Sequence, residues 1–179
     1  AIATANGIGS ISIVRVSGAK ALEIATKISK KNNFQARLAT LSTIYDSKNE
    51  IIDEALVIYF KAPFSFTGED VVEFQCHGGV AISNMIVDEV LNAGARLANP
   101  GEFSKRAFFN NKIDLTKAEA ISKIIEARSA DAVKLLARQL KGELTNFVDE
   151  IREDLLFMLA YTEVSIDYAE EDLPTDIYE

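Results

Sequence analysis

The spacing of apolar residues changes between residues 100 and 112, and this change constrains the fold more than any other feature of the sequence. Before it, apolar and polar residues alternate in short stretches such as SISIVRV (10–16), which is typical of β-strands. After it, apolar residues recur in steps of three and four, which is typical of amphipathic helices. We therefore expect two parts with different architectures, residues 1–112 and residues 113–179.

The first part is predicted to mix strands and helices. Alternating stretches bounded by turn residues predict the strands, and Ser17 and the Gly78-Gly79 pair are suited to precede helices. We predict strands over 10–16, 37–45, 54–60 and 71–77, helices over 18–30 and 80–92, and a last short strand or extended segment over 95–100. This order predicts an α+β or α/β sheet domain.

The second part is predicted to be helical. Thr116 and Glu119 have the spacing of a capping box at a helix start. Beyond Ser129, one long amphipathic helix is expected, whose seam lies close to a coiled-coil repeat and needs a partner, either helices outside this chain or a second copy. The acidic end, residues 162–179, is expected to be a linker or the start of another element. The seam consists of Val133, Leu136, Leu140, Leu144, Phe147, Ile151, Leu155 and Met158.

Charge is distributed unevenly between the two parts. Residues 1–112 contain 12 Lys and Arg against 11 Asp and Glu, whereas residues 113–179 contain 7 against 16, a net charge of −9. Nucleic-acid affinity depends on basic side chains that neutralise phosphates. We therefore expect no tight RNA or DNA binding by this chain alone.

Several classes of protein are disfavoured by what the sequence lacks. No apolar run approaches the roughly 18–20 residues that span a bilayer, and no leader signals export, so no membrane association and a cytoplasmic setting are expected. One cysteine and one histidine cannot fill a zinc shell, so no metal site is predicted. There is no G-x-x-x-x-G-K-[ST] motif, so this chain cannot bind a nucleotide by a P-loop.

The stretch SFTGEDVVEFQCHGG (65–79) contains the most concentrated polar chemistry in the chain. Alternation along a strand directs Cys76 into the core and Glu73 and His77 to the opposite face. A Cys-His catalytic pair is therefore disfavoured, and no catalytic residue is assigned. A ligand site beside the glycines that open the next helix and an ordinary solvated sheet face are equally compatible with this stretch.

One further charged residue and one charged group are candidates. Arg15 is the one charged residue inside an otherwise apolar strand, so it needs an acceptor, either a protein carboxylate such as Glu73 or an anionic ligand. A predicted short helix is surrounded by four charged residues, Glu102, Lys105, Arg106 and Lys112. By itself, such a distribution of charges is typical of a solvent-exposed surface.

Four segments in this order resemble a known family: IATANGIGSISIVRVSG, SFTGEDVVEFQCHGG, NPGEFSKRAFFNNKIDLTKAEAI and TEVSIDYAEEDLP. The chain resembles the N-terminal region of the MnmE (TrmE) family of tRNA-modification GTPases, without its G domain. The resemblance implies a folate-binding and dimerisation domain over residues 1–112, similar to the folate domain of glycine-cleavage T-proteins. It also implies that residues 113–179 begin a central helical domain.

For the whole protein, the resemblance implies a homodimer that works with MnmG, an FAD enzyme, to modify C5 of the wobble uridine of tRNA. GTP, Mg²⁺ and K⁺ are implied at a G domain that this chain does not contain. The chain by itself is therefore expected not to hydrolyse GTP.

The family's folate contacts map onto Arg15, Glu73 and Lys112, with 5-formyl-tetrahydrofolate or a related one-carbon folate as the ligand. Glu73 suits the paired N–H and amino group of a pterin, whereas Arg15 and Lys112 suit either the anionic glutamate tail or the ring carbonyl. Four more residues are expected to neighbour this pocket: His77, Gly78, Gly79 and Glu102.

Two alternatives remain open at this point. One is a complete folate-dependent one-carbon transferase of the T-protein type, against which the chain's length argues. The other is a purely structural dimerisation scaffold with a vestigial pocket.

Overall fold

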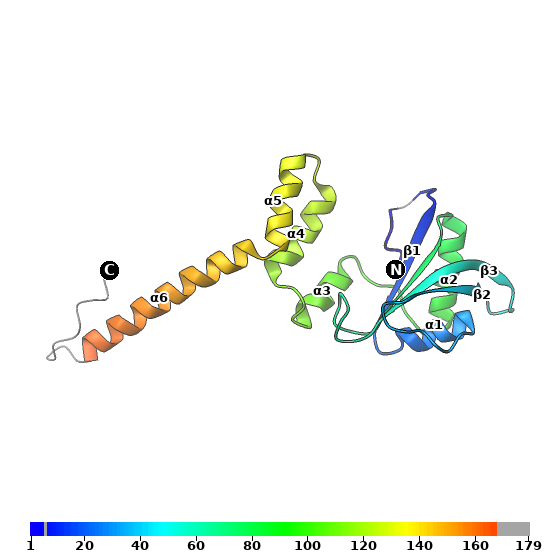
Figure 1. The fold of residues 1–179 in the computed structure, drawn as a ribbon, viewed down its shortest axis with the longest axis horizontal. Coiled ribbons are helices and arrows are strands. Elements are labelled where there is room, and N and C mark those ends of the chain that lie inside the picture. The colour runs from blue at the N-terminus through cyan, green and yellow to red at the C-terminus, as the bar shows by residue number, and fades with distance from the viewer. Residues whose placement is uncertain (6, 168–179) are drawn as a thin grey trace. The chain divides into compact units, whose positions relative to one another are not determined.

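The computed structural model describes residues 1–5 and 7–167, and the chain forms two compact units (Figure 1). Unit 1 is Ala1–Asp114 and unit 2 is Leu115–Glu179. Each unit is described by itself below.

Unit 1 is a four-stranded antiparallel sheet with helices. Its strands follow the order β1-β4-β3-β2. The predicted α+β class is therefore confirmed, and every strand pair is antiparallel. The elements are β1 (Ile11–Ser17), α1 (Ala21–Ser29), β2 (Ala39–Tyr45), β3 (Ile51–Phe60), β4 (Val71–His77), α2 (Val80–Asn92) and α3 (Glu102–Phe109).

The core of unit 1 lies between the sheet and the two helices α1 and α2. Val14, Val57 and Phe74 are fully buried on the sheet, and Ile24 and Ile86 meet them from the helices. We call the side of the sheet that faces away from α1 and α2 the outer face. The residues that alternate with the core residues along each strand point to this face. The predicted inward direction of Cys76 is confirmed, because its side chain is only 2% exposed.

Of the two possibilities predicted for 95–100, a short strand or an extended segment, the strand is not formed. The edge of β1 is already occupied by the N-terminal segment, where the Ala3 N–H donates to the Ile13 carbonyl and the Arg15 N–H to the Ala1 carbonyl. Pro100 also lacks a backbone N–H for a ladder. The segment instead connects α2 to α3.

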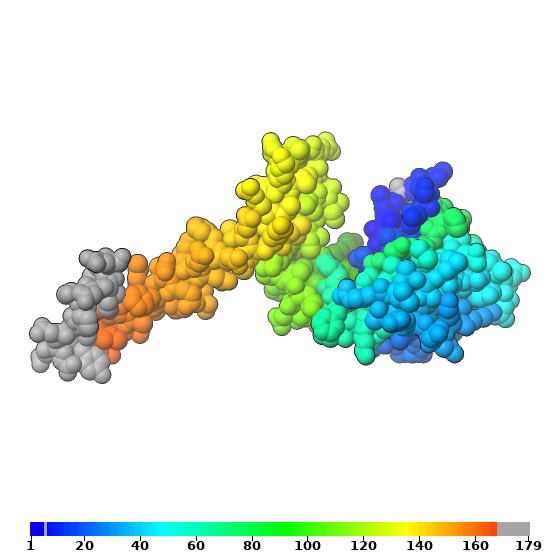
Figure 2. All heavy atoms as spheres, viewed as in Figure 1, coloured from blue at the N-terminus to red at the C-terminus, as the bar shows by residue number. Residues whose placement is uncertain are grey.

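Within residues 115–167, the described part of unit 2, the chain forms three helices, α4 (Leu115–Glu126), α5 (Ala130–Leu140) and α6 (Glu143–Asp167). Ser129 caps α5, because its Oγ accepts a hydrogen bond from the Ala132 N–H at 3.2 Å. The prediction of one long helix beyond Ser129 is wrong, since the chain breaks at Gly142, whose φ of +90° is outside the helical region. α6 has no buried residue, and its side chains are exposed along its length (Figure 2).

Two smaller predictions in unit 2 also need correction. α4 begins at Leu115, so Thr116 lies inside the helix and is not its N-cap. Part of the acidic end, residues 162–167, belongs to α6 and is not a linker. The rest of that segment, 168–179, lies outside the described residues. None of the helices in the described ranges combines the length and apolar character that crossing a bilayer requires.

Candidate functional site

Arg15 and Glu73 form an ion pair on the outer face of the sheet. They lie directly opposite each other in the β1–β4 register, so strand pairing alone brings the two side chains together. Arg15 Nε donates to Glu73 Oε1 at 2.7 Å, and Arg15 Nη2 lies 2.6 Å from the same oxygen as an ion pair. The side chains are 29% and 13% exposed. Of the two acceptors predicted for Arg15, the structure therefore shows the protein carboxylate.

An aromatic ring from α3 also contacts Arg15. The guanidinium carbon lies 5.7 Å from the centroid of the Phe103 ring, which is within the range of a cation–π interaction. Arg15 is thus held by a carboxylate and by a ring that come from different elements. The sequence contained no signal for this ring contact, because Phe103 and Arg15 are 88 positions apart and packing alone brings them together.

Lys112 lies just after α3, where its backbone N–H donates to the Ala107 carbonyl at 2.8 Å. Its side-chain stem packs beside the loop before β4, because a Cβ added to Gly68 would lie 3.1 Å from Lys112 Cγ. Within residues 1–5 and 7–167, no ion pair or hydrogen bond engages its ammonium group, which is exposed. Its charge is available to an anionic ligand.

His77, at the end of β4, pairs with Asp53 of β3. Its Nδ1 lies 2.7 Å from Asp53 Oδ1, and its backbone N–H donates to Asp53 Oδ2 at 2.8 Å. The imidazole is 71% exposed, whereas the carboxylate is only 9% exposed. This dyad orients the histidine ring, and sequence reasoning missed Asp53 because the partner comes from another strand.

Gly78 and Gly79 lie at the start of α2 beside the N-terminal segment. A Cβ added to Gly78 would lie 2.2 Å from the carbonyl oxygen of Gly9, so a side chain there would clash with backbone. The Gly9 N–H donates to the Gly78 carbonyl at 3.0 Å. Both glycines line a hollow of about 510 Å³ between residues 2–12 and α2. Close backbone packing therefore explains why Gly78 is a glycine.

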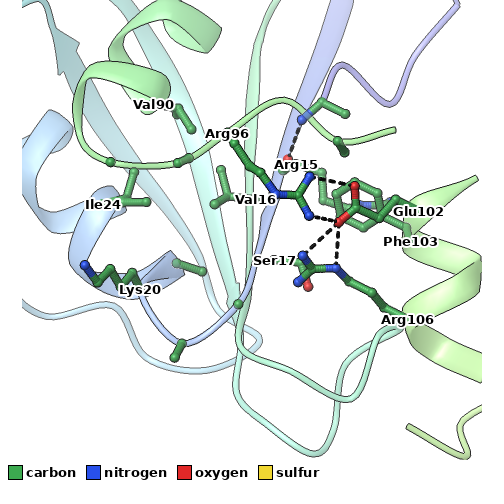
Figure 3. Close-up of a pocket in the computed structure, with 17 residues that line it drawn as sticks. Arg15, Val16, Ser17, Lys20, Ile24, Val90, Arg96, Glu102, Phe103 and Arg106 are labelled. Carbon is green, nitrogen blue, oxygen red and sulfur yellow. Dashed lines mark hydrogen bonds and ion pairs between the residues drawn. The ribbon is translucent and has the colours of Figure 1, made fainter. Parts of the chain in front are cut away.

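A second cavity, of about 260 Å³, opens among the ends of α1, α2 and α3 (Figure 3). Ile24 and Val90 form an apolar wall, and Arg96, Glu102 and Arg106 form a charged one. We call it the helix-end cavity. Arg15 and Glu102 line it, but Glu73 and Lys112 line neither this cavity nor the hollow at α2.

Glu102 is saturated with hydrogen bonds from its own chain. It accepts from Arg96 at 2.5 and 2.9 Å, from Arg106 at 2.8 Å and from the Asn99 N–H at 2.8 Å. The hydrogen bonds from Arg96, followed by the one from Asn99, hold the pKa of Glu102 well below its usual range. Arg106 continues the network to Glu69 at 2.9 Å. This carboxylate therefore organises the start of α3.

The structure places no metal-binding cluster of three or more acidic, histidine or cysteine side chains within the described ranges. Cys76 is buried, and burial raises the pKa of its thiol, which favours the unreactive protonated form. Its Sγ donates to the Ser12 carbonyl at 3.3 Å. The interpretation of Cys76 as a small core residue is therefore supported.

Comparison with known proteins identifies the family. The family of the GTP-binding protein TrmE N-terminus matches residues 1–112, and the MnmE helical domain family matches residues 115–179. The chain belongs to the MnmE family.

Relatives of the MnmE family match the chain along its whole length. The tRNA modification GTPase MnmE of Aliarcobacter butzleri is 99% identical over all 179 residues, which cover 40% of that protein. The MnmE proteins of Sulfurimonas denitrificans and Campylobacter curvus are 66% and 57% identical over 99% and 100% of the chain, again 40% of their own length. The chain thus spans about two fifths of the length of these MnmE proteins, and its first 112 residues match the TrmE N-terminus family.

The structure brings some of the predicted MnmE site residues together and leaves others apart. Arg15 and Glu73 form a direct pair, whereas no hydrogen bond or ion pair within the described part of the chain joins Lys112 to either of them. His77 and Glu102 are each engaged with other partners.

Proposed function

We propose that residues 1–112 bind 5-formyl-tetrahydrofolate, or a related one-carbon folate, at the outer face of the sheet. The observation that carries the proposal is the largely buried carboxylate of Glu73, whose Oε1 takes both contacts from Arg15 while Oε2 has no hydrogen-bond partner among residues 1–5 and 7–167. A carboxylate held in this way suits the paired N–H and amino group of a pterin. Arg15 and Lys112 supply positive charge for the glutamate tail or the ring carbonyl.

The four remaining predicted residues are proposed as neighbours of the ligand. His77 and the two glycines flank the end of β4, and Glu102 anchors the helix that carries Phe103. We assign none of them a direct folate contact.

Isothermal titration calorimetry with 5-formyl-tetrahydrofolate tests this proposal on the 179-residue chain. Wild type is expected to bind, and Glu73→Ala is expected to lose at least tenfold in affinity, since a hydrogen bond to a charged group contributes about 1.5–3 kcal/mol. Glu54→Ala is the matched control, because Glu54 is an exposed carboxylate on the adjacent strand β3. Absence of heat with wild type would refute folate binding, and full affinity in Glu73→Ala would refute the assignment of Glu73.

We also propose that residues 1–112 form a homodimer. Apolar side chains remain exposed on the outer face, with Leu41 at 58%, Leu56 at 40% and Ile11 at 62% exposed. Leu41 and Leu56 are opposite each other in the β2–β3 register, so they form a continuous apolar strip. Sedimentation of wild type at micromolar concentration is expected to show a dimer that Leu56→Asp dissociates, whereas Leu97→Asp, off the sheet, does not. A monomeric wild type would contradict the proposal.

For the whole protein, we propose the activity named in its relatives, which is tRNA modification by a GTPase. We place this activity in the cytoplasm, where tRNA is found. The partner would be an MnmG-type FAD enzyme and the target C5 of the wobble uridine, with GTP, Mg²⁺ and K⁺ bound by the G domain outside this chain. This chain alone is expected not to hydrolyse GTP or to bind tRNA tightly. A gel shift of tRNA at submicromolar concentrations of the chain would contradict the expectation of weak tRNA binding.

The comparisons and the proposed titration bear differently on the two alternatives, a T-protein-type transferase and a structural dimerisation scaffold. Residues 115–179 match the MnmE helical domain family, which does not support a T-protein-type transferase. A purely structural dimerisation scaffold predicts no folate binding, so the calorimetric titration separates it from our proposal.

A further inference from the structure

We propose that the helix-end cavity is a second binding site, which takes a small monocarboxylate with an apolar body (Figure 3). The site is separate from the folate proposal, because Glu73 and Lys112 do not line it. The inference rests on the size of the cavity, on its apolar wall and on the charges around it.

The size of the cavity limits the ligand to a small molecule. Pockets that hold drug-sized ligands measure about 300–1,000 Å³, and the volume of this cavity is about 260 Å³. All of its lining residues belong to unit 1, so the cavity is formed within one compact unit. A carboxylate with a single ring suits this volume better than a whole folate, which is drug-sized.

The apolar wall selects the body of the ligand. Ile24, Val90 and Val16 line the cavity from α1, α2 and β1, and they are only 3%, 5% and 7% exposed. Such side chains offer water no hydrogen bond, whereas a buried water needs two to four polar partners. An apolar ligand body that displaces water from this wall therefore gains free energy.

The charges around the cavity select an anion. Four basic side chains and one acidic side chain line it. Three of the basic side chains are arginines, and each is paired with a carboxylate. The ammonium group of Lys20, by contrast, has no ion pair or hydrogen bond within the part of the chain that the structure describes. This single unpaired positive charge suits one carboxylate. The three ion pairs are Arg15 with Glu73, Arg96 with Glu102 and Arg106 with Glu69.

The positions of Lys20 and Ile24 allow one small ligand to contact both. Lys20 is the N-cap of α1, and its carbonyl accepts a hydrogen bond from the Ile24 N–H at 2.9 Å. Residues four positions apart on a helix lie on the same face, one turn from each other. A lysine ammonium on its flexible stem can follow a carboxylate while the body of the ligand contacts Ile24.

A two-dimensional ¹H–¹⁵N NMR titration of the 179-residue chain with benzoate tests the site. Saturable shifts are expected at the backbone amides of Ile24, Gly94 and Arg96. Benzamide has the ring without the charge, and acetate has the charge without the ring. Each is expected to bind at least about tenfold more weakly than benzoate.

Two variants separate the charge from the space. Lys20→Gln is expected to weaken benzoate about tenfold and to leave benzamide unchanged, because only the charge is removed. Ala98→Leu, at a half-buried lining position, is expected to weaken both compounds by filling the cavity. Lys27→Gln is the matched control, since Lys27 is an exposed lysine of α1 that does not line the cavity. Lys20 is exposed as well, so Lys20→Gln keeps the test decisive if Ala98→Leu disturbs the fold.

Four outcomes would overturn the inference. Benzoate could cause no saturable shift at these amides, or benzamide could bind as tightly as benzoate. Lys20→Gln and Lys27→Gln could have equal effects, which would make the attraction unspecific. An excess of 5-formyl-tetrahydrofolate could displace benzoate, which would make the cavity part of the folate site. Failure of folate binding at the outer face would leave the inference intact, so the two proposals are tested separately.

Discussion

The two units of the chain bury their apolar side chains to very different extents. In unit 1, Phe74, Val14 and Ile86 are fully buried between the sheet and its helices. In unit 2, Ala120 is the one fully buried apolar residue within the described range, and α5 and α6 have none. The apolar spacing in a helical sequence therefore predicts which side chains share one face of the helix. Burying that face requires another element to pack against it. Unit 1 contains such elements within its own residues.

The largest expected difference in the free energy of unfolding comes from replacing one phenylalanine by alanine in each unit. Phe74→Ala, at 0% exposure, is expected to cost about 3–5 kcal/mol in the free energy of unfolding, because it leaves a cavity in a packed core. Phe157→Ala, at 58% exposure on α6, is expected to change it by less than about 0.5 kcal/mol. Urea unfolding of both variants measures the difference. Equal losses would contradict the contrast between the units.

A second contrast lies within unit 1, between adjacent glycines. Gly78→Ala is expected to destabilise unit 1 by about 1–3 kcal/mol, because the new Cβ would meet the Gly9 backbone at 2.2 Å. Gly79→Ala is the matched control, since its Cβ would lie 3.5 Å from Ile82 Cδ1, an ordinary contact. Thermal unfolding should separate the two variants, and a fully stable Gly78→Ala would show that the N-terminal segment does not pack there.

Burial in unit 1 also predicts a dependence on pH. Burial, followed by a hydrogen bond to Asp70 at 2.9 Å, raises the pKa of Tyr59 to about 12. The unfolded state loses this proton near pH 10 and the folded state near pH 12, so stability should fall as the pH rises through that window. Tyr59→Phe should lose about 1 kcal/mol at neutral pH but show a shallower alkaline decline. An unchanged alkaline slope in Tyr59→Phe would contradict this assignment.

The smallest expected effect lies in unit 2, at the break between α5 and α6. Gly142 has a φ of +90°, which alanine adopts only with strain. Because Ala120 is the one fully buried apolar side chain of unit 2 within the described range, we expect Gly142→Ala to relax into a more continuous helix. The free energy of unfolding should change by less than about 0.5 kcal/mol while the helical circular-dichroism signal rises. A loss above 1 kcal/mol without added helix would show that the break is rigidly held.

Local periodicity predicted much of the sheet and its two faces. Alternation in β4 directed Cys76 inward and Glu73 outward, as the structure shows, because side-chain direction along a strand depends only on neighbouring residues. The single charge inside β1 likewise indicated that Arg15 needed an acceptor.

Features that depend on long-range packing could not be predicted from the sequence. The contacts of Phe103 with Arg15 and of Asp53 with His77 join distant elements. The break at Gly142 was missed because the apolar steps of three and four continue across it.

The most direct test of the central proposal is a two-dimensional ¹H–¹⁵N NMR titration of the 179-residue chain with 5-formyl-tetrahydrofolate. Saturable shifts are expected at the backbone amides of Arg15, Glu73 and Gln75 on the outer face, with no saturable shifts along α6. In Glu73→Ala, saturating these shifts should require at least tenfold more ligand, and the rest of the spectrum should not change. Shifts confined to the helix-end cavity around Ile24 and Val90, or no saturable shifts at all, would contradict folate binding at the outer face.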